Sequence, residues 1–229
     1  MLNKKLLEEI LNRYNIKVKN YDNFLLAMTH SSYANEHHLK HNERIEFLGD
    51  AILGLLVAEY IYKNFEDMSE GNMTKLRATY VCEDANAKYA REVGIDKLLL
   101  LGHGEELTGG RQRQAILSDA FESFLGAIYL SGSIDEVRKL LEIVVFPHVL
   151  AIDERQFTDY KSLLQEYIQA ETRLPVEYRL ENVQGPPHLR EFTMSVYLDG
   201  IRLGRGCGRS KKDAAQAAAA DALKKVAKN

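Results

Sequence analysis

Two apolar helical stretches that each carry several carboxylates constrain the fold of this chain more than any other feature. Glu43, Glu46 and Asp50 lie in the first stretch, and Asp119 and Glu122 lie in the second. Their spacings of three and four residues place each set on one face of a helix. The other positions are largely apolar, so both helices are expected to be buried. If the helices pack together, four or five carboxylates meet, and only cations make that arrangement tolerable.

A solvated acidic face is the simpler interpretation of the first set alone, because like charges on an exposed helix cost only about 0.2–0.5 kcal/mol per pair. The second set decides between the two interpretations, because residues 116–126 around it are too apolar for a surface helix. Together the two sets favour a buried cation site.

A site of this kind suits the hydrolysis of phosphodiester bonds. The reaction needs an activated water, a stabilised leaving oxygen and neutralised phosphate charge, and two divalent ions about 3.5–4 Å apart supply all three. Hard cations such as Mg²⁺ prefer carboxylate oxygens. The pattern therefore predicts Glu46, Asp50, Asp119 and Glu122 as metal-binding and catalytic residues. Mg²⁺ is the expected cofactor, with Mn²⁺ able to substitute, and no organic cofactor is expected.

The first two thirds of the chain show a helical pattern throughout. Asn42 is expected to cap a long helix that runs through Tyr60 or Tyr62, with Glu43 in the first turn, where the helix dipole favours an acid. Two more helices are expected at 114–130, ended by Gly132, and at 134–150. No strand pattern competes, so an all-α domain is predicted at residues 1–152.

The pattern changes near residues 153–158, and a second, small α+β domain is predicted at 158–229. Residues 191–198 alternate between apolar and polar side chains, as in a half-buried strand. The Asp199-Gly200 pair that comes next is a hairpin turn signal. The expected order is α-β-β-β-α, with helices at 159–170 and 210–226 and strands at 176–182, 191–198 and 201–207.

The start of the last helix has the pattern of a phosphate-binding site. Ser210 as N-cap and Asp213 three residues later form a capping box of the Ser-x-x-Asp kind. Two lysines then lie in the first turn, where the helix dipole disfavours cations but free N–H groups favour a phosphate. The expected basic patch consists of Arg205, Arg209, Lys211 and Lys212.

The net charge of −3 hides an asymmetry that agrees with this division. Residues 1–153 carry 17 Lys and Arg against 23 Asp and Glu, whereas residues 154–229 carry 13 against 10. An acidic part joined to a mildly basic part suits a metal-using catalytic domain beside a domain that binds a polyanion.

Several motifs resemble those of bacterial ribonuclease III. Residues 42–50 closely resemble its signature sequence, and residues 70–78, 109–111 and 116–130 match further pieces of the family in the same order. The α-β-β-β-α part resembles a double-stranded-RNA-binding domain. The resemblance covers nearly the whole chain, and its implications for activity, partners and site residues are expectations.

The resemblance implies an endoribonuclease that hydrolyses both strands of double-stranded RNA with a divalent metal. It implies 5′-phosphate ends, short 3′ overhangs, and a role in processing ribosomal, messenger and other structured RNA precursors. It assigns metal binding to Glu46, Asp119 and Glu122, and the closest involvement in catalysis to Asp50 and Glu122. Glu43 and Glu70 match further acids of the family and are expected to support the site or to contact RNA.

The resemblance also implies how the chain binds its partners. Ser162, Gln165 and Glu166 on the first helix of the second domain would reach the 2′-hydroxyls of RNA, and His188 in a loop between two strands would enter a minor groove. The family works as a homodimer. Phe47 is expected at the dimer interface, although the sequence is equally compatible with a place in the core.

The location expected from the sequence is the cytoplasm. Only Cys82 and Cys207 are present, far apart in the chain, which fits a reducing compartment. No apolar run approaches the roughly 18 residues that span a membrane, and the N-terminal stretch carries acids, unlike a secretory signal.

Three other interpretations compete with this one. The helical domain could only dimerise, which would make the chain an inert double-stranded-RNA-binding protein. A carboxylate–metal phosphatase acting on small molecules is also conceivable, but the basic tail argues against it. His37, His38 and His41 suggest zinc, but they lie in a polar stretch without a His-Glu-x-x-His motif.

Overall fold

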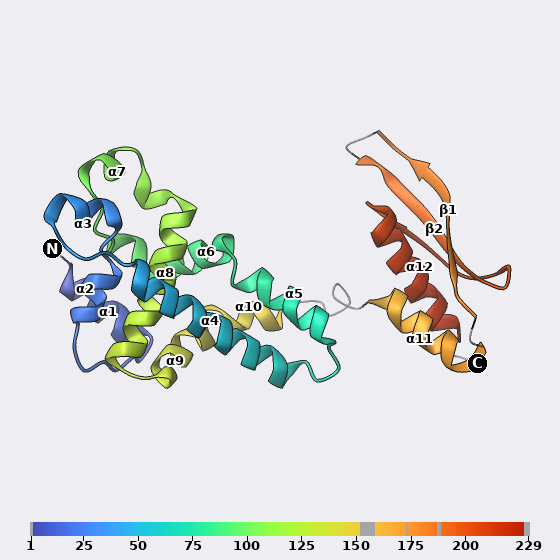
Figure 1. Cartoon of the computed structure of the whole chain (residues 1–229), viewed down its shortest axis with the longest axis horizontal. Helices are drawn as coiled ribbons and strands as arrows, with labels where there is room; N and C mark the ends of the chain where they lie inside the picture. The colour runs from blue at the N-terminus through green and yellow to red at the C-terminus, as the bar shows by residue number, and fades with distance from the viewer. Residues whose placement is uncertain (1, 152–158, 173, 187–188, 227–229) are drawn as a thin grey trace. The chain divides into compact units, whose positions relative to one another are not determined.

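A computed structural model describes residues 2–151, 159–172, 174–186 and 189–226 of the chain (Figure 1). The chain divides into two compact units, Met1–Phe157 and Thr158–Asn229. Unit 1 is helical and unit 2 combines two helices with one sheet, so the predicted fold class is confirmed. Within the described ranges, no helix combines the length and the apolar content that crossing a membrane requires.

Unit 1 consists of α-helices joined by short connections and two 3₁₀ turns. The α-helices are α1 (Lys4–Arg13), α2 (Asp22–Ala27), α3 (Ser31–His37), α4 (Glu43–Asn64), α5 (Glu70–Tyr80), α6 (Glu83–Val93), α7 (His103–Leu107), α8 (Gln114–Ser131), α9 (Ile134–Val144) and α10 (Phe146–Leu150). The 3₁₀ turns are η1 (Ile95–Lys97) and η2 (Gly110–Gln112). Helix α8 passes through the middle of the core, where Phe121 and Phe124 are fully buried.

Helices α4 and α8 cross at near backbone contact, and two glycines make this possible (Figure 1). A Cβ atom on Gly49 of α4 would overlap the carbonyl oxygen of Glu122 on α8. A Cβ atom on Gly126 of α8 would lie 2.5 Å from the carbonyl oxygen of Ile45 on α4. The crossing therefore brings the two acid-bearing turns together, as the sequence predicts.

The start of α4 differs in one respect from the sequence prediction. The helix begins directly after Asn42, but the Asn42 side chain does not cap it. The Asn42 amide instead donates a hydrogen bond of 3.3 Å to Ser123 Oγ on α8. A buried amide needs a partner, and the neighbouring helix supplies one.

The single helix expected at 134–150 is wrong, because the structure has two helices there. Helix α9 ends before Val145, and Pro147 lies in the first turn of α10. Proline has no N–H to donate and clashes with the preceding turn, so it is tolerated only at a helix start. Helix α4 also runs to Asn64, slightly beyond its expected end.

Unit 2 has the order α-β-β-β-α. Its elements are α11 (Tyr160–Thr172), β1 (Glu177–Gln184), β2 (Glu191–Leu198), β3 (Ile201–Gly208) and α12 (Lys211–Val226). The strands form an antiparallel sheet in the order β1-β2-β3. Asp199 and Gly200 have φ values of 47° and 77°, as a tight two-residue hairpin turn requires, so the predicted turn is confirmed.

Small residues let α12 lie directly on the sheet. A Cβ atom on Gly204 or Gly206 of β3 would collide with the α12 backbone around Ala218. The core of unit 2 contains Leu164 and Ile168 of α11, Met194 and Val196 of β2, and five alanines of α12 (Ala214, Ala215, Ala218, Ala219 and Ala222). The alanine-rich composition of α12 is therefore what the close packing needs.

Candidate active site

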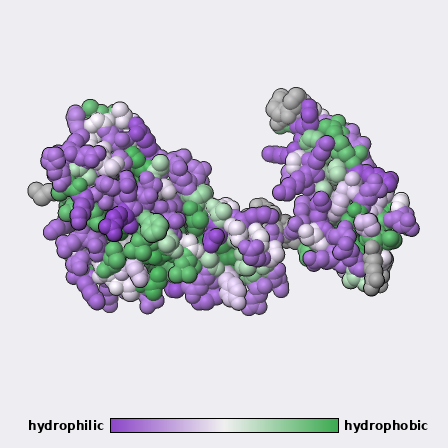
Figure 2. Space-filling model, in the orientation of Figure 1, coloured by the Kyte–Doolittle hydropathy of each residue, from purple (hydrophilic) through white to green (hydrophobic). Residues whose placement is uncertain are grey.

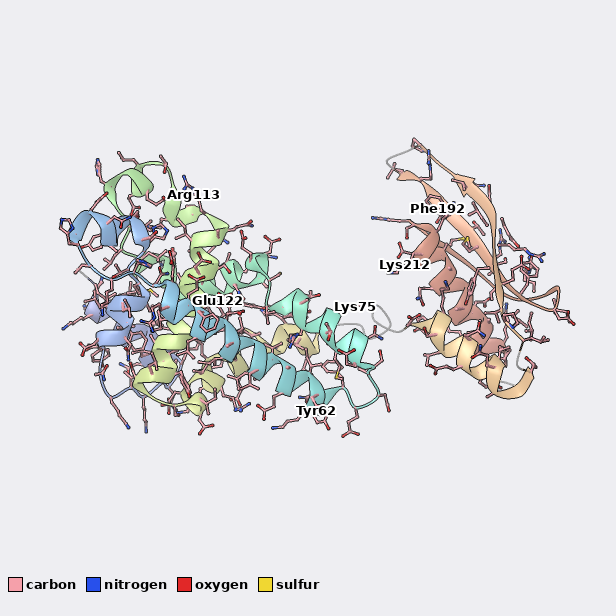
Figure 3. The ribbon with its side chains drawn as sticks, viewed as in Figure 1. Tyr62, Lys75, Arg113, Glu122, Phe192 and Lys212 are labelled. Atoms are coloured by element: carbon pink, nitrogen blue, oxygen red, sulfur yellow. The ribbon has the colours of Figure 1, made fainter. Side chains whose placement is uncertain are left out.

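The predicted acids of α4 and α8 share one electrostatic neighbourhood. Burial raises the pKa of Glu122 to about 8, and the negative charges of Asp50, Glu46 and Asp119 add to this effect. Burial likewise raises the pKa of Glu46 to about 7, with Asp119, Glu43 and Asp50 contributing. Such mutual effects require the carboxylates to be close. The four predicted acids and Glu43 are therefore neighbours where α4 and α8 cross. Figure 3 labels Glu122 at this crossing.

Asp119 connects this cluster to two groups that sequence reasoning missed. Burial raises the pKa of Asp119, the charge of Glu83 on α6 raises it further, and His30 at the start of α3 lowers it. No pattern in the sequence connects residues 30 and 83 with the two acid-bearing helices. The packing of α6 on α8 brings Glu83 to the site, and His30 is held in place by the hydrogen bond of 3.1 Å from its N–H to the carbonyl oxygen of Leu100.

Asn86 of α6 is a third missed residue. It is 0% exposed, and its Nδ2 donates a hydrogen bond of 2.7 Å to Oε1 of Glu122. This bond opposes the rise in the pKa of Glu122. The one signal in the sequence is an asparagine between two alanines on the buried face of an amphipathic helix.

The residues fit a divalent cation by their chemistry. Clustered carboxylate oxygens are the ligands that hard cations prefer. Burial, together with repulsion between the acids, raises the pKa values of Glu46 and Glu122, and a bound cation would offset both effects. Over the ranges that the structure describes, no group of three or more His, Cys, Asp or Glu side chains forms a ready-made metal site. The acids are neighbours, and drawing them onto one ion needs side-chain movement.

Glu70 lies apart from this cluster. It is on α5, where its Oε1 accepts a hydrogen bond of 3.0 Å from Thr74 Oγ1. It lines an apolar groove of about 340 Å³ together with Leu55 and Tyr62 of α4. Tyr62, labelled in Figure 3, is 16 residues beyond Glu46, which is about 24 Å along the helix. Glu70 is also not among the charges that shift the pKa values of Glu46, Asp119 and Glu122.

Phe47 is exposed rather than buried in the core. Its side chain is 79% accessible on α4, and Leu55 and Tyr62 of the same helix are also exposed. Figure 2 shows apolar surface along this helix. Large contiguous apolar surface on a helix is typical of an interaction site.

The three histidines considered as zinc ligands, His37, His38 and His41, do not form a common site. His37 donates from Nδ1 to the carbonyl oxygen of Tyr33 at 3.0 Å and stacks on the Tyr33 ring. His38 ends α3 in the left-handed conformation, and His41 Nδ1 lies 3.7 Å from Glu43 Oε1. Each histidine thus has its own local role.

In unit 2, Ser162, Gln165 and Glu166 line one hollow of about 590 Å³ together with Lys212. Gln165 is partly buried, and its Oε1 accepts a hydrogen bond of 3.4 Å from the backbone N–H of Val176. The structure therefore brings the predicted residues of α11 to the same hollow as Lys212, one residue of the predicted basic patch. His188 lies outside the described residues.

The predicted cap of α12 is confirmed in a modified form. Ser210 Oγ accepts a hydrogen bond of 3.1 Å from the Asp213 N–H, and it donates its own proton to Asp213 Oδ2 at 2.7 Å. Lys211 and Lys212 are exposed, and neither forms an ion pair with any residue that the structure describes. Figure 3 labels Lys212. Arg209 is also exposed.

Arg205, unlike the other cations of the predicted basic patch, forms an ion pair within the described residues. Its Nε lies 3.4 Å from Glu181 Oε2, and Arg202 approaches the same carboxylate. The sequence shows no acid between residues 205 and 212, but β1 supplies one from the neighbouring part of the sheet. Among the residues that the structure describes, the cations at the start of α12 without an ion-pair partner are thus Arg209, Lys211 and Lys212.

Comparisons with known proteins match both units. A family model described as ribonuclease-III-like matches residues 22–149, and one for a double-stranded RNA binding motif matches residues 160–226. Ribonuclease 3 of Halalkalibacterium halodurans is 48% identical over 222 residues, which are 96% of this chain and 84% of that protein. Ribonuclease 3 of Bacillus cereus strain G9842 is 49% identical over 203 residues, 87% of this chain and 83% of that protein.

Solved structures agree with these matches. The nuclease domain of ribonuclease III from Campylobacter jejuni, solved at 2.2 Å, superposes with a TM-score of 0.59 at 35% identity. The superposition covers 67% of this chain and all of that domain. A second structure of the same domain, described for its flexibility in the region involved in dimer formation, gives a TM-score of 0.57 at 35% identity and covers 62% of this chain and 99% of that domain.

Proposed function

Because this chain belongs to the ribonuclease III family, we propose that it is a divalent-metal-dependent endoribonuclease that cuts both strands of double-stranded RNA. The catalytic domain is residues 1–152 and the RNA-binding domain is residues 158–229. One observation supports the proposal most strongly: four carboxylates lie near one another where α4 and α8 cross. The other unit of the same chain matches a double-stranded RNA binding motif.

Glu46, Asp50, Asp119 and Glu122 would hold the metal ions, with Mg²⁺ as the natural cofactor and Mn²⁺ able to replace it. Bound divalent ions supply a nucleophilic water and neutralise the charge of the phosphate. Asp50 and Glu122 are the acids closest to catalysis in this proposal, and Glu43 supports the cluster through its charge beside Glu46 and Asp119. Burial of Glu46 and Glu122 keeps bulk water from screening their interaction with a cation.

The RNA-binding domain would hold the duplex by its shape and its phosphates. Arg209, Lys211 and Lys212 are free to bind phosphate oxygens at the N-terminus of α12. Ser162, Gln165 and Glu166 lie in the same hollow as Lys212 and would contact 2′-hydroxyls, with His188 in a second minor groove. Such contacts recognise A-form geometry and do not require a particular base sequence.

We propose that the chain acts as a homodimer formed through the exposed apolar side of α4. Phe47 would be buried against a second copy, as large aromatic anchors of interfaces are. Two-fold symmetry would place two sites on opposite strands of one duplex, which would leave 5′-phosphate ends and short 3′ overhangs. Glu70 borders the groove beside Leu55 and Tyr62, so its supporting role would concern a site completed in the dimer.

The substrates in this proposal are precursors of ribosomal RNA, messenger RNA and other structured RNA. The cytoplasm is the proposed location, because both cysteines are free and exposed.

A cleavage assay on a plain RNA duplex tests the proposal. The protein should cut the duplex with Mg²⁺ and stop when excess chelator is added. Binding without cutting at any metal concentration would instead identify an inert double-stranded-RNA-binding protein. Efficient cutting in excess chelator would rule out the metal requirement.

A further inference from the structure

Asn86 is the one neutral side chain that contacts the acid cluster through a hydrogen bond within the described ranges. It lies on α6, faces α8, and donates from Nδ2 to Oε1 of Glu122 at 2.7 Å. A hydrogen bond to a carboxylate oxygen is charge-assisted and stronger than one between neutral groups. It restricts the rotation of the Glu122 carboxylate and fixes one of its two oxygens.

The carbonyl oxygen of the Asn86 side chain, Oδ1, makes no hydrogen bond within the described residues. This oxygen is buried, and Asn86 itself is 0% exposed. A buried acceptor without a partner destabilises a protein, and each such group in a native structure calls for an explanation. A leucine of similar size would fill the same space without this cost, so packing alone does not explain an asparagine here.

The position of Asn86 offers the explanation. Groups that orient a metal-binding side chain from behind fix its direction, and their loss weakens metal binding without any change in the ligands themselves. Glu122 approaches the cluster from α8, and Asn86 contacts it from α6, a helix that carries none of the four predicted ligands.

We propose that Asn86 is a positioning residue, which holds the carboxylate of Glu122 in place for a divalent cation. The inference rests on the proposed function, because it takes Glu122 to be a metal ligand. It adds a residue of α6 to a site that is otherwise built from α4 and α8. It also implies that the buried, unpartnered Oδ1 of Asn86 is tolerated because the Nδ2 of the same amide donates to Glu122.

The test replaces Asn86 by a side chain of similar size that cannot donate. Asn86→Leu removes the bond to Glu122 and also removes the unpartnered oxygen, so the cost of leaving Glu122 Oε1 without its donor is partly offset and the fold should survive. Asn86→Ala gives the same test if leucine is not accommodated. The matched control is Asn23→Leu, because Asn23 Nδ2 donates to Ser131 Oγ on the same helix α8 at 3.0 Å, nine residues beyond Glu122. Nine residues are about 14 Å along a helix.

The main readout is the binding of Mn²⁺ to the metal-free full-length protein without RNA, followed by electron paramagnetic resonance. Asn86→Leu should bind Mn²⁺ about tenfold more weakly than the wild type, and Asn23→Leu should bind it equally well. In cleavage assays, the metal concentration needed for half-maximal rate should rise about tenfold in Asn86→Leu. The KM for the RNA duplex should stay unchanged, and kcat should recover at high metal concentration.

The outcomes separate the two proposals. If the wild type itself binds no Mn²⁺, the metal site of the proposed function is wrong. If the wild type binds Mn²⁺ and both Asn86 variants bind it as tightly, the positioning role is wrong and the proposed function stands. If both variants unfold while Asn23→Leu folds, Asn86 is a structural core residue and the positioning role is overturned.

Discussion

The acid cluster of unit 1 and the basic start of α12 in unit 2 place charge in opposite environments. Glu46 and Glu122 are half-buried beside other acids, which raises the pKa of each. Lys211 and Lys212 are exposed and have no ion-pair partner in the described residues. Buried like charges are costly until a cation arrives, and a small hard ion fits among them. Exposed free lysines remain in water until a polyanion replaces their counterions.

The difference shows how burial separates chemistry from binding in this chain. The acid cluster depends on the close crossing of α4 and α8, so it should be sensitive to any change in packing. The basic patch depends on side chains that pack against little, so changes there should leave the fold intact. Substitutions in the two regions should therefore have very different consequences.

The largest effect is expected for Gly49→Ala. The new Cβ would overlap the carbonyl oxygen of Glu122, so α4 and α8 must move apart. We expect a loss of about 2–3 kcal/mol or more in the free energy of unfolding, together with loss of cleavage. Gly104→Ala on α7 is the control, because its Cβ would meet no atom within 4 Å. Denaturant unfolding measures both, and equal stability of the two variants would contradict the close crossing.

The second prediction concerns the basic patch. Replacing Lys211 and Lys212 together by Ala should weaken the binding of every RNA duplex alike, because phosphate contacts carry no sequence information. The slope of log affinity against log salt concentration should become shallower by roughly one unit for each lost contact. Thermal unfolding and cleavage at saturating RNA should not change.

Lys224→Ala, an exposed change near the opposite end of the same helix, provides the comparison. If its salt slope falls as much as that of the double variant, α12 binds RNA without a preferred end. The assignment of the patch to the start of the helix would then be wrong.

The third prediction is a pH dependence of stability in the metal-free protein. An ordinary glutamate has a pKa of 4.5, whereas the pKa of Glu122 is about 8 in the folded state. Well below pH 4.5, Glu122 is protonated in both the folded and the unfolded state, so it does not destabilise the folded state. As the pH rises towards 8, the unfolded chain loses this proton first, so the folded state becomes less stable.

Glu122→Gln removes the contribution of Glu122 to this pH dependence, while that of Glu46 remains. In excess chelator, the variant should therefore gain stability relative to the wild type between pH 5 and pH 8. Urea unfolding at the two pH values measures the difference. An equal difference at both pH values would show that Glu122 is not crowded by its neighbours in the folded state.

Much of this arrangement could be predicted from the sequence, because its signals are local. The spacing of Glu46, Asp50, Asp119 and Glu122 shows which helix faces carry acids, and the apolar residues around them show that the helices are buried. The alternation of residues 191–198 and the Asp199-Gly200 turn predict β2 and its hairpin, and both are confirmed. The half-buried character of β2 is not, because Thr193 and Ser195 on its polar face are buried as well.

The features that were missed depend on partners distant in sequence. Asn42 is of a residue type that often caps helices, but its side-chain amide donates a hydrogen bond to Ser123, 81 positions away in the sequence. Arg205 is part of a basic run, yet it pairs with Glu181 from another strand. Asn86 belongs to a helix without an acid pattern and contacts Glu122 only after folding. Local patterns predict which side chains are available, and packing decides which of them meet.

The most direct test of the central claim measures binding and cutting of one RNA duplex by the wild type and Glu122→Gln in the same Mg²⁺ buffer. Removing one ligand of a metal site that supplies several kcal/mol should slow cleavage by about a thousandfold or more. Binding rests on unit 2, so the affinity and the salt slope should equal those of the wild type. Cleavage at the wild-type rate at low Mg²⁺, or a parallel loss of binding and cutting, would contradict the separation of the two functions.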